Sequence, residues 1–527
     1  MIGDFGAALP HSRAESLRLS DRRLELIEAV PRSGIAAAIG SETLTESQRL
    51  SAQNASEPLK DSTTISVACF LPVATASCHC LLLLPTAAAS CSCLLLLPSA
   101  TIHWLHSNQK LGTENTMSQP RIVVLGGGFA GLFTALDLAG SGEVTLVSDD
   151  DHFLFTPMLY EYLSGEVEEW HIAPKYNELL NDTAHFVKDV VAGVDFASQT
   201  VSLASYPEPI PYDVLVLAVG GITNYVGVEG AEEHTIPFRK ISHADRLRQL
   251  MVTALDGIPP DTPPQDVQKA LTFAVVGAGA SGCELSTKMA DLLLDACKRR
   301  ALHGEPRLLV IEMGDKVVPG MGDQIREFVE DALQKSHVEV HTLTRVVSVS
   351  AEGVTFEHNG KQEELKTSGV VWTGGVKMSP LIEHLDAEKN KRGLLVLKPT
   401  LQLSRFENVF ALGDIAAYAD ASPTLAGTAQ LAFQQASLAG KNIKALLAGK
   451  ELQTKHFEEL GEAISLGTER AAVLTGGKAF GGAIARQARF ALYTSRLPTW
   501  HHRLRVGASW FFEGTTPRPL LPLGFER

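Results

Sequence analysis

Residues Arg121–Gly140 read RIVVLGGGFAGLFTALDLAG, and this stretch decides the fold. Its first five residues form a β-branched, apolar run that is typical of a buried parallel strand. Gly126, Gly128 and Gly131 follow with G-x-G-x-x-G spacing, and a helical pattern comes next. The first glycine permits a tight turn, the second lets a pyrophosphate approach the backbone, and the third lets the helix pack closely on the strand. The stretch therefore predicts a Rossmann-like dinucleotide-binding unit, with a ligand-free glycine turn as the alternative.

The strand expected next is Glu143–Val147, and in such units the residue at its end binds a ribose. An acidic residue is expected there, but the position holds Ser148, and three aspartates follow at 149–151. We assign the ribose hydroxyls to Asp149.

A second copy of the pattern spans residues 271–291, which read LTFAVVGAGASGCELSTKMAD. Its glycines are Gly277, Gly279 and Gly282. The strand after its helix ends in Glu312, which suits an adenosine 2′-hydroxyl and would repel a 2′-phosphate, so NADH is favoured over NADPH. Two such units in one chain indicate a flavoprotein that takes hydride from a pyridine nucleotide. Two units that bind the same ligand are the alternative.

Two later segments fit the flavin half. YDVLVLAVGG (Tyr212–Gly221) is a buried strand that ends in glycine, where backbone passes close to a cofactor. ENVFALGDIAAY (Glu407–Tyr418) is a strand that ends in Gly413 and Asp414. A carboxylate at this place can bind the ribityl hydroxyls of a flavin, and an aspartate on a surface turn is the alternative.

AQLAFQQ (Ala429–Gln435) belongs to a helical stretch that runs from 428 to 447. Gln430 and Gln434 are four residues apart and therefore share one helix face. Neutral amides can donate to a quinone carbonyl and remain compatible with a mostly apolar pocket. An exposed polar face is the alternative.

Charge and cysteine usage exclude several functions. The 527 residues carry a formal net charge of −14, which argues against a general nucleic-acid binder. No cysteine occurs between Arg121 and Gly282 and none follows Cys297, so the dithiol chemistry of disulfide reductases and sulfide:quinone oxidoreductases is excluded. Cys283 and Cys297 are interpreted as buried packing thiols. No metal site is evident.

Residues 1–116 differ from the rest of the chain. SCHCLLLLPTA (Ser77–Ala87) recurs as SCSCLLLLPSA (Ser90–Ala100), and prolines cut the apolar run into pieces shorter than the roughly 20 residues that a membrane span needs. Metal binding by the Cys-x-Cys pairs is the less favoured interpretation. Met117 begins the stretch MSQPRIVVLGG, which is a natural start for a dinucleotide-binding domain. We therefore interpret residues 1–116 as a mis-assigned translation start or an organelle-targeting extension.

The C-terminal region reverses the sign of the overall charge. Between Lys478 and Arg518 lie seven basic residues and one acid, Glu513. The other basic residues are Arg486, Arg489, Arg496, Arg503 and Arg505, and the interleaved aromatics are Phe480, Phe490, Tyr493, Trp500, Trp510, Phe511 and Phe512. This composition predicts an amphipathic helix that lies in a membrane interface, too interrupted by charges and Pro498 to span it. A helix packed on the body with a solvated basic face is the alternative.

Over about residues 119–512 the chain resembles the type II, non-proton-pumping NAD(P)H:quinone oxidoreductases. FLFTPMLYEYLSGEVEEWHIAP (Phe153–Pro174) resembles the branch of cyanobacteria and plastids that is linked to reduction of demethylphylloquinone and other prenyl quinones. VVWTGGV (Val370–Val376) is similar to the family's segment beside the flavin, and AQLAFQQ to its quinone-site motif. Ser148 departs from the family, in which an acid is usual.

The resemblance implies a fold, cofactors and roles. It implies an α/β, glutathione-reductase-like architecture with FAD bound non-covalently, NADH as donor with NADPH as the alternative, and a prenyl quinone as acceptor, without proton pumping. Glu284 would face the nicotinamide–flavin region as a catalytic residue, and Gln430 and Gln434 would lie beside the isoalloxazine and the quinone headgroup. The residues assigned to cofactor binding are Gly126, Gly128, Phe129, Ala130, Gly131, Asp149, Thr156, Pro157, Gly220, Gly277, Gly279, Gly282, Glu312, Gly374, Gly413, Asp414, Ala429 and Gln430.

The expected organisation follows. Segments 119–255 and 366–425 form an FAD domain, 266–365 an NAD(P)H domain, and 426–527 the quinone-site helix and a membrane-binding region. We expect a monotopic membrane protein on the cytoplasmic side of a thylakoid or plasma membrane, or in a plastid. The oligomeric state is left open, and a homodimer is one of the options. A redox-sensing or scaffolding flavoprotein and a reductase of a small electron-transfer protein are the competing hypotheses.

Overall fold

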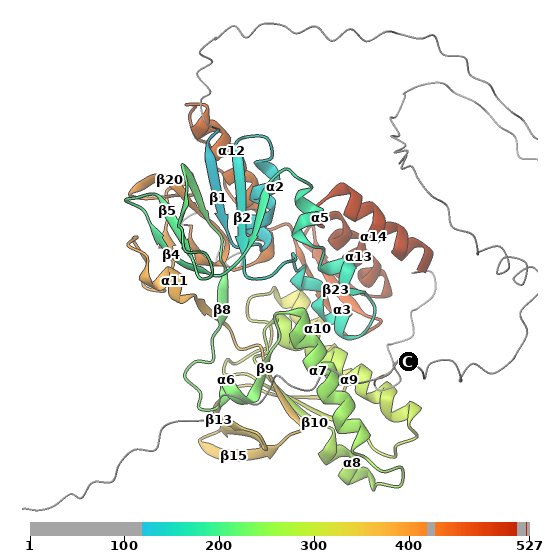
Figure 1. Cartoon of the computed structure of the whole chain (residues 1–527). Coiled ribbons are helices and arrows are strands. Elements are labelled where there is room, and N and C mark those ends of the chain that lie inside the picture. The colour runs from blue at the N-terminus through green and yellow to red at the C-terminus, as the bar shows by residue number, and fades with distance from the viewer. Residues whose placement is uncertain (1–118, 419–426, 514–522, 524–527) are drawn as a thin grey trace, which may run out of the picture. The chain divides into compact units, whose positions relative to one another are not determined.

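The computed structural model describes residues 119–418, 427–513 and 523 (Figure 1). The 1–116 extension, with its cysteine repeats, lies outside the described residues, as does Arg518. The side chains of Phe512 and Glu513 are likewise not described.

A six-stranded sheet carries the first glycine turn. Its order is β19-β20-β7-β1-β2-β3, and the strands from β20 to β3 run parallel. The strands are β1 (Arg121–Leu125), β2 (Glu143–Ser148), β3 (His185–Lys188), β7 (Val214–Leu217), β19 (Gln402–Leu403) and β20 (Phe406–Ala411). Helices α2 (Phe129–Asp137) and α12 (Ala429–Leu447) lie together beside this sheet (Figure 1). The two helices pack closely at Gly440 of α12, where an added Cβ would come within 2.9 Å of the Cβ of Asp137 of α2.

A five-stranded parallel sheet carries the second glycine turn. Its order is β12-β11-β10-β16-β9. The strands are β9 (Thr235–Pro237), β10 (Thr272–Val276), β11 (Arg307–Ile311), β12 (Val338–His341) and β16 (Gly369–Trp372), and the main helices are α9 (Ala280–Arg299) and α10 (Asp323–Lys335). The predicted boundaries place β9 and β16 in the FAD domain, whereas both strands pair within this second sheet, so these two boundaries need correction.

Smaller elements connect and cover the two sheets. The strands are β4 (Val191–Asp195), β5 (Thr200–Leu203), β6 (Ile210–Pro211), β8 (Gly221–Thr223), β13 (Thr344–Ser350), β14 (Gly353–His358), β15 (Lys361–Lys366), β17 (Val376–Met378), β18 (Leu395–Val396), β21 (Ala416–Ala417), β22 (Glu462–Ser465), β23 (Ala471–Thr475) and β24 (Lys478–Gly482). The helices are η1 (Thr156–Met158), α3 (Leu159–Leu163), α4 (Glu169–Ile172), α5 (Tyr176–Leu180), α6 (Ala231–His234), α7 (Ile241–Asp256), α8 (Pro264–Ala270), α11 (Pro380–His384), η2 (Gly413–Ile415), α13 (Ala483–Ser495) and α14 (Trp500–Glu513).

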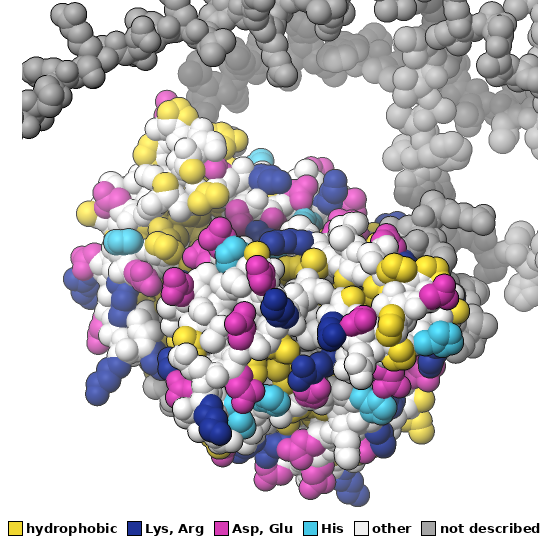
Figure 2. Space-filling model, turned by 90° about the horizontal axis from the view of Figure 1, so that it is seen from below, with side chains coloured by type: hydrophobic (Ala, Val, Ile, Leu, Met, Phe, Trp, Pro, Cys, Tyr) yellow, Lys and Arg dark blue, Asp and Glu magenta, His cyan; other side chains and the backbone are white. Residues whose placement is uncertain are grey.

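The cores are those of parallel α/β sheets. Every residue of β7 and β10 is buried, which explains their continuous apolar sequences. In Figure 2, lysine and arginine side chains are interspersed with aspartate and glutamate over the face seen from below, with hydrophobic side chains in groups between them. Among the described helices, none combines the length and apolar character that crossing a membrane requires.

Candidate functional site

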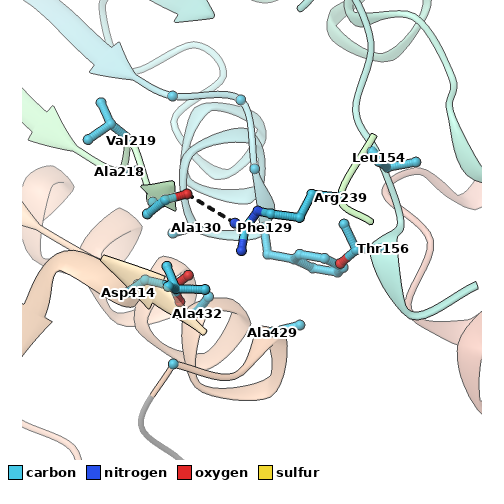
Figure 3. Close-up of a pocket in the computed structure, with 18 of the residues that line it drawn as sticks. Phe129, Ala130, Leu154, Thr156, Ala218, Val219, Arg239, Asp414, Ala429 and Ala432 are labelled. Carbon is cyan, nitrogen blue, oxygen red and sulfur yellow. Dashed lines mark hydrogen bonds between the residues drawn. The ribbon is translucent and has the colours of Figure 1, made fainter. Parts of the chain in front are cut away.

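One cavity joins the two glycine turns. It has a volume of about 2010 Å³ and is lined by the first turn, by the N-terminus of α9 and by the start of α12. Figure 3 shows its flavin-side wall, where the labelled residues Phe129, Thr156, Arg239, Asp414 and Ala429 surround one space. Segments far apart in sequence therefore converge on a single site.

The three glycines of the first turn differ in what surrounds them. Gly126 has φ +100°, and an added Cβ would meet Ala218 O at 2.3 Å. A Cβ on Gly131 would lie 1.8 Å from Gly126 O, so only glycine allows the helix to approach the strand. Gly128 is the N-cap of α2 without a side-chain cap, and a Cβ there would meet nothing within 4 Å. The uncapped amides thus face open cavity, which suits a pyrophosphate.

The second turn repeats this construction. Gly277 has φ +101°, and an added Cβ would come within 3.0 Å of Gly374 Cα. A Cβ on Gly282 would lie 1.9 Å from Gly277 O, and Gly279 is an uncapped N-cap with open space around it. Gly374 lies against this second turn and outside the cavity lining, so its predicted place beside the flavin is corrected.

The two positions assigned to ribose binding differ in their contacts. Asp149 lines the cavity, and its carboxylate forms an ion pair with Lys240 at 3.2 Å. Glu312 lies outside the cavity lining and accepts hydrogen bonds from Ala278 N at 2.6 Å and Gly314 N at 2.7 Å. Its carboxylate is therefore held against the second turn by backbone amides.

Asp414 and Arg239 are oppositely charged residues that line the cavity near the first glycine turn. Burial raises the pKa of Asp414, and the positive charge of Arg239 opposes that shift. Arg239 Nη2 also donates to Gly221 O at 3.0 Å. The N–H of Gly413 donates to Gln435 Oε1 at 2.7 Å, which fixes the turn that presents Asp414. Sequence reasoning missed Arg239 because no motif surrounds it.

The cavity fits FAD. The uncapped amides at Gly128 suit its pyrophosphate, and the half-buried carboxyl of Asp414 suits polyol hydroxyls. Thr156 and Pro157 line the same cavity, as do Gly220, Ala429 and Gln430. Gly131 and Gly282 lie outside its lining because their role is packing.

Glu284 is buried at the cavity wall near the start of α9. Its Oε1 accepts a hydrogen bond from Ser465 N at 2.8 Å and lies 3.2 Å from Arg489 Nη2. Burial raises the pKa of Glu284 to about 7, against the attraction of Arg489 and with help from the negative charge of Glu161. The carboxyl is therefore poised to change charge near neutral pH.

Arg489 is the centre of a buried charge cluster that sequence reasoning missed. Its side chain is 2% exposed, and it donates to Glu161 Oε1 at 2.7 Å and Pro157 O at 2.7 Å, besides Glu284. The guanidinium also lies 4.6 Å from the ring centre of Tyr493, which lines the cavity. One side chain of α13 thus joins both dinucleotide units.

Lys288, Glu166 and Arg486 extend this cluster. Lys288, on α9, forms an ion pair with Glu166 and lies 3.8 Å from Glu161 Oε1. Arg486 Nη2 donates to Glu166 Oε1 at 2.9 Å. The prediction that Arg486 and Arg489 face a membrane is therefore wrong, because both guanidinium groups point inward to carboxylates.

The outward faces of α13 and α14 carry several exposed apolar side chains. Ile484 is 77% exposed, and Trp500, Leu504 and Phe511 are 62%, 63% and 73% exposed. On the inner side of α14, His502 Nε2 donates to His171 O at 2.9 Å. The helix therefore packs on the body and still presents an apolar stripe.

The two predicted quinone-site glutamines share a helix face as expected but bind protein backbone. Gln430 lines the cavity, and its amide pairs with Leu460 N and Gly461 O. Gln434 is 6% exposed, lies outside the cavity lining, and its amide pairs with both backbone groups of Glu458. The predicted direct place of Gln434 beside the acceptor is corrected accordingly.

The two cysteines of the described residues are reduced and buried. Cys283 Sγ donates to Ala278 O at 3.4 Å, and burial raises the pKa of its thiol to about 12. A thiol with such a pKa is a packing group and not a nucleophile.

Comparisons with known proteins agree with this geometry. The family described as pyridine nucleotide-disulphide oxidoreductase matches residues 120–436. Demethylphylloquinone reductase NdbB of Synechocystis is 36% identical over 75% of this chain and 96% of its own length. The alternative NAD(P)H-ubiquinone oxidoreductase C1 of Arabidopsis thaliana is 32% identical over 75% of this chain and 80% of its own. The structure of NDH2 from Plasmodium falciparum with NADH superposes with a TM-score of 0.67 at 17% identity, covering 76% of this chain and 99% of that one.

Proposed function

The chain belongs to the pyridine nucleotide-disulphide oxidoreductase family and, within it, to the type II NAD(P)H:quinone oxidoreductases, and on this premise we propose how its cavity serves that reaction. It is an FAD-dependent enzyme that passes electrons from NAD(P)H to a quinone. One observation carries the assignment of the site: a single cavity runs from the first glycine turn past Glu284 to Gln430 and Tyr493. Donor, flavin and acceptor can therefore be aligned in one cavity, and alignment is the protein's main contribution to cofactor chemistry.

The first unit holds FAD in this proposal. The amides at Gly128, Phe129 and Ala130 bind the pyrophosphate, and Asp414 binds the ribityl chain. Asp149 remains our assignment for the adenosine ribose. When bound, FAD supplies the two-electron chemistry that side chains lack.

The second unit holds NADH. The open N-terminus of α9 at Gly279 binds its pyrophosphate. Glu312, preorganised by two backbone amides, meets the adenosine ribose and disfavours the 2′-phosphate of NADPH. Glu284, whose pKa is raised to about 7, stands where it can hold or release a proton at the cavity wall.

The acceptor is proposed to enter from the C-terminal side. Phe433, Leu492, Tyr493 and Arg496 line the cavity there, next to Gln430. This wall is largely apolar with a few polar groups, as a quinone ring requires. Our proposed class is a prenyl quinone of the demethylphylloquinone, plastoquinone or menaquinone type, and the name of one relative, demethylphylloquinone reductase NdbB, supports the first of these.

A membrane surface is the proposed source of this quinone. The exposed stripe of Trp500, Leu504 and Phe511 on α14, with Ile484 on α13, suits insertion into the interface of a bilayer. His501 and Arg505 border it on the exposed side. We propose peripheral attachment at the cytoplasmic face of a thylakoid or plasma membrane, or in a plastid.

Stopped-flow absorbance tests the function. The full chain with FAD is mixed anaerobically with NADH and then with a soluble menaquinone or plastoquinone analogue. Fast bleaching followed by fast quinone-dependent recovery is expected. Bleaching without recovery by any quinone would contradict the acceptor assignment and favour a protein acceptor.

A further inference from the structure

The segment between α12 and β22 has an unusual attachment. Residues 450–461 form neither helix nor strand, yet Glu459, Leu460 and Gly461 line the acceptor end of the cavity. An extended segment without a partner strand must satisfy its backbone groups by other means. Side-chain amides of α12 do this here.

Three amide side chains of α12 each bind the segment through both of their polar atoms. Asn442 donates to Gln453 O at 2.9 Å and accepts from Gln453 N at 2.8 Å. Gln434 donates to Glu458 O at 2.8 Å and accepts from Glu458 N at 3.3 Å. Each pair copies the double hydrogen bond between facing residues of an antiparallel sheet.

Gln430 completes the row at the cavity. It donates to Gly461 O at 3.2 Å and accepts from Leu460 N at 3.0 Å. The helix positions 430, 434 and 442 meet the segment positions 460, 458 and 453 in reverse order, so the segment runs antiparallel to α12. One helix face therefore replaces a strand.

The attached segment is connected to the acceptor end of the cavity and to Glu284 in two ways. Leu460, 45% exposed, and Gly461 form part of the cavity wall directly. Beyond them the chain enters β22, whose Ser465 N–H binds Glu284 Oε1 at 2.8 Å. Asn442, in contrast, is fully buried and lies outside the cavity lining.

We propose that Gln434 and Asn442 are positioning residues, which with Gln430 clamp segment 453–461 onto α12 and thereby set the wall against which the quinone docks. This inference rests on the proposed function and replaces direct contact of Gln434 with the acceptor. Asn442 also donates to Thr400 O at 3.0 Å but lies outside the cavity lining, so a quinone senses it indirectly.

Hydrogen exchange measured by mass spectrometry tests the clamp without any quinone. In the full-length holoenzyme, Gln434→Leu and Asn442→Leu should each speed amide exchange in peptides covering 453–461 by roughly tenfold, because the amides of Gln453 and Glu458 lose their acceptors. Peptides from β10 and α9 should exchange as in the wild type, which shows that each variant is folded.

Kinetics supply the second readout. With menadione as acceptor, both variants should raise the quinone KM roughly tenfold while flavin reduction by NADH stays within about twofold. Gln434→Glu, which keeps the acceptor for Glu458 N, should fall between wild type and Gln434→Leu. Asn408→Leu is the matched control, because Asn408 Nδ2 also binds a distant backbone oxygen, Asp213 O, at 3.0 Å but does not touch the segment.

The outcomes separate the clamp from the proposed function. A raised KM in Gln434→Leu with unchanged exchange would mean direct contact with the quinone and would overturn the clamp. Wild-type exchange and KM in Asn442→Leu would overturn it as well. Failure of every quinone to reoxidise the wild-type flavin would refute the proposed function, and the exchange data would still decide the clamp.

Discussion

In the first unit the glycine turn faces Ser148 at the end of β2, whereas in the second unit the equivalent place at the end of β11 holds Glu312. The turns themselves are alike, since Gly126 N donates to Val147 O and Gly277 N to Ile311 O, both at 2.8 Å. The carboxylate of Glu312 accepts hydrogen bonds from its own turn, whereas Asp149 and Asp150 after Ser148 form ion pairs with Lys240. The glycine pattern thus sets the backbone of a dinucleotide site, and the residue at the strand end decides how the adenosine is selected.

The two units also differ in what supports them. The first relies on residues from distant elements, Asp414 after β20 and Arg239 after β9, to complete its cavity. The second carries Glu312, the acid that we propose for selecting the nucleotide, within the motif itself. We expect that one substitution, at Glu312, can change which nucleotide the second unit binds. The first unit would need several substitutions for such a change.

The largest expected effect comes from the residue that joins the units. Arg489→Met removes the cation that contacts both Glu161 and Glu284 and leaves Lys288, 3.8 Å from Glu161, as the nearby positive charge, which we expect to lower stability by about 3–5 kcal/mol. Arg486→Met should cost less, because Arg486 is 26% exposed at its side chain and pairs only with Glu166. Thermal unfolding followed by circular dichroism measures both. Equal losses would show that the link between units is unimportant.

The same substitution in each turn should separate the two ligands. Gly131→Ala and Gly282→Ala each place a Cβ within 2 Å of a carbonyl oxygen, and relief of such overpacking costs about 1–3 kcal/mol. Gly131→Ala should purify with less than half of its FAD, whereas Gly282→Ala should keep FAD and be reduced by NADH at least tenfold more slowly. Flavin absorbance and stopped-flow bleaching give the two values. Loss of FAD in both variants would contradict independent sites.

The substitution Glu312→Gln tests whether the residue at the end of β11, and not Ser148 at the end of β2, selects NADH over NADPH. The amide of glutamine offers an acceptor to only one of the two backbone N–H groups, those of Ala278 and Gly314, that the carboxylate binds, and it removes the repulsion of a 2′-phosphate. We expect the preference for NADH over NADPH, measured as the ratio of kcat/KM values, to fall roughly tenfold. Ser148→Ala should leave this ratio unchanged, and a similar change there would place the donor in the first unit.

The smallest expected effect is a pH dependence from Glu284. Its pKa is raised to about 7 mainly by burial, with Arg489 opposing and Glu161 reinforcing the shift. We expect quinone-dependent reoxidation to fall several-fold as pH rises through 7, and Glu284→Gln to flatten the profile. An unchanged inflection in this variant would assign it to another group.

Stability should follow the same titration with a definite sign. The folded-state pKa of about 7 exceeds the ordinary value of 4.5, so the unfolded chain loses its proton first as pH rises. The native state is therefore destabilised progressively between about pH 4.5 and 7. Relative to the wild type, Glu284→Gln should be more stable at pH 8 than at pH 5, as chemical denaturation at both values can measure.

Local patterns made the two turns predictable. Strand, turn and helix are adjacent in the chain, and the distinct demands on Gly126, Gly128 and Gly131 follow from spacing alone. The helix face shared by Gln430 and Gln434 was predictable for the same reason. What these amides bind was not, because segment 453–461 has no periodic pattern.

Long-range charge pairing escaped prediction for a physical reason. Arg489 and Glu161 lie 328 residues apart, and nothing near either residue indicates the other. Basic residues among aromatics on a helix suit a membrane surface and a buried network equally well. Only packing showed that Arg486 and Arg489 face inward while Ile484 faces out.

The position of Arg489 near the end of the chain has a consequence for biosynthesis. Glu161 leaves the ribosome 328 residues before its partner, and at about 5–20 residues per second the delay is roughly 16–66 s. During that interval neither nucleotide unit can bury its carboxylates against this arginine. The buried charge cluster is therefore complete only after α13 has been made, and a premature stop codon after β24 would yield a protein that has both glycine turns and the contacts of Lys288 with Glu161 and Glu166 but lacks Arg489 between the units.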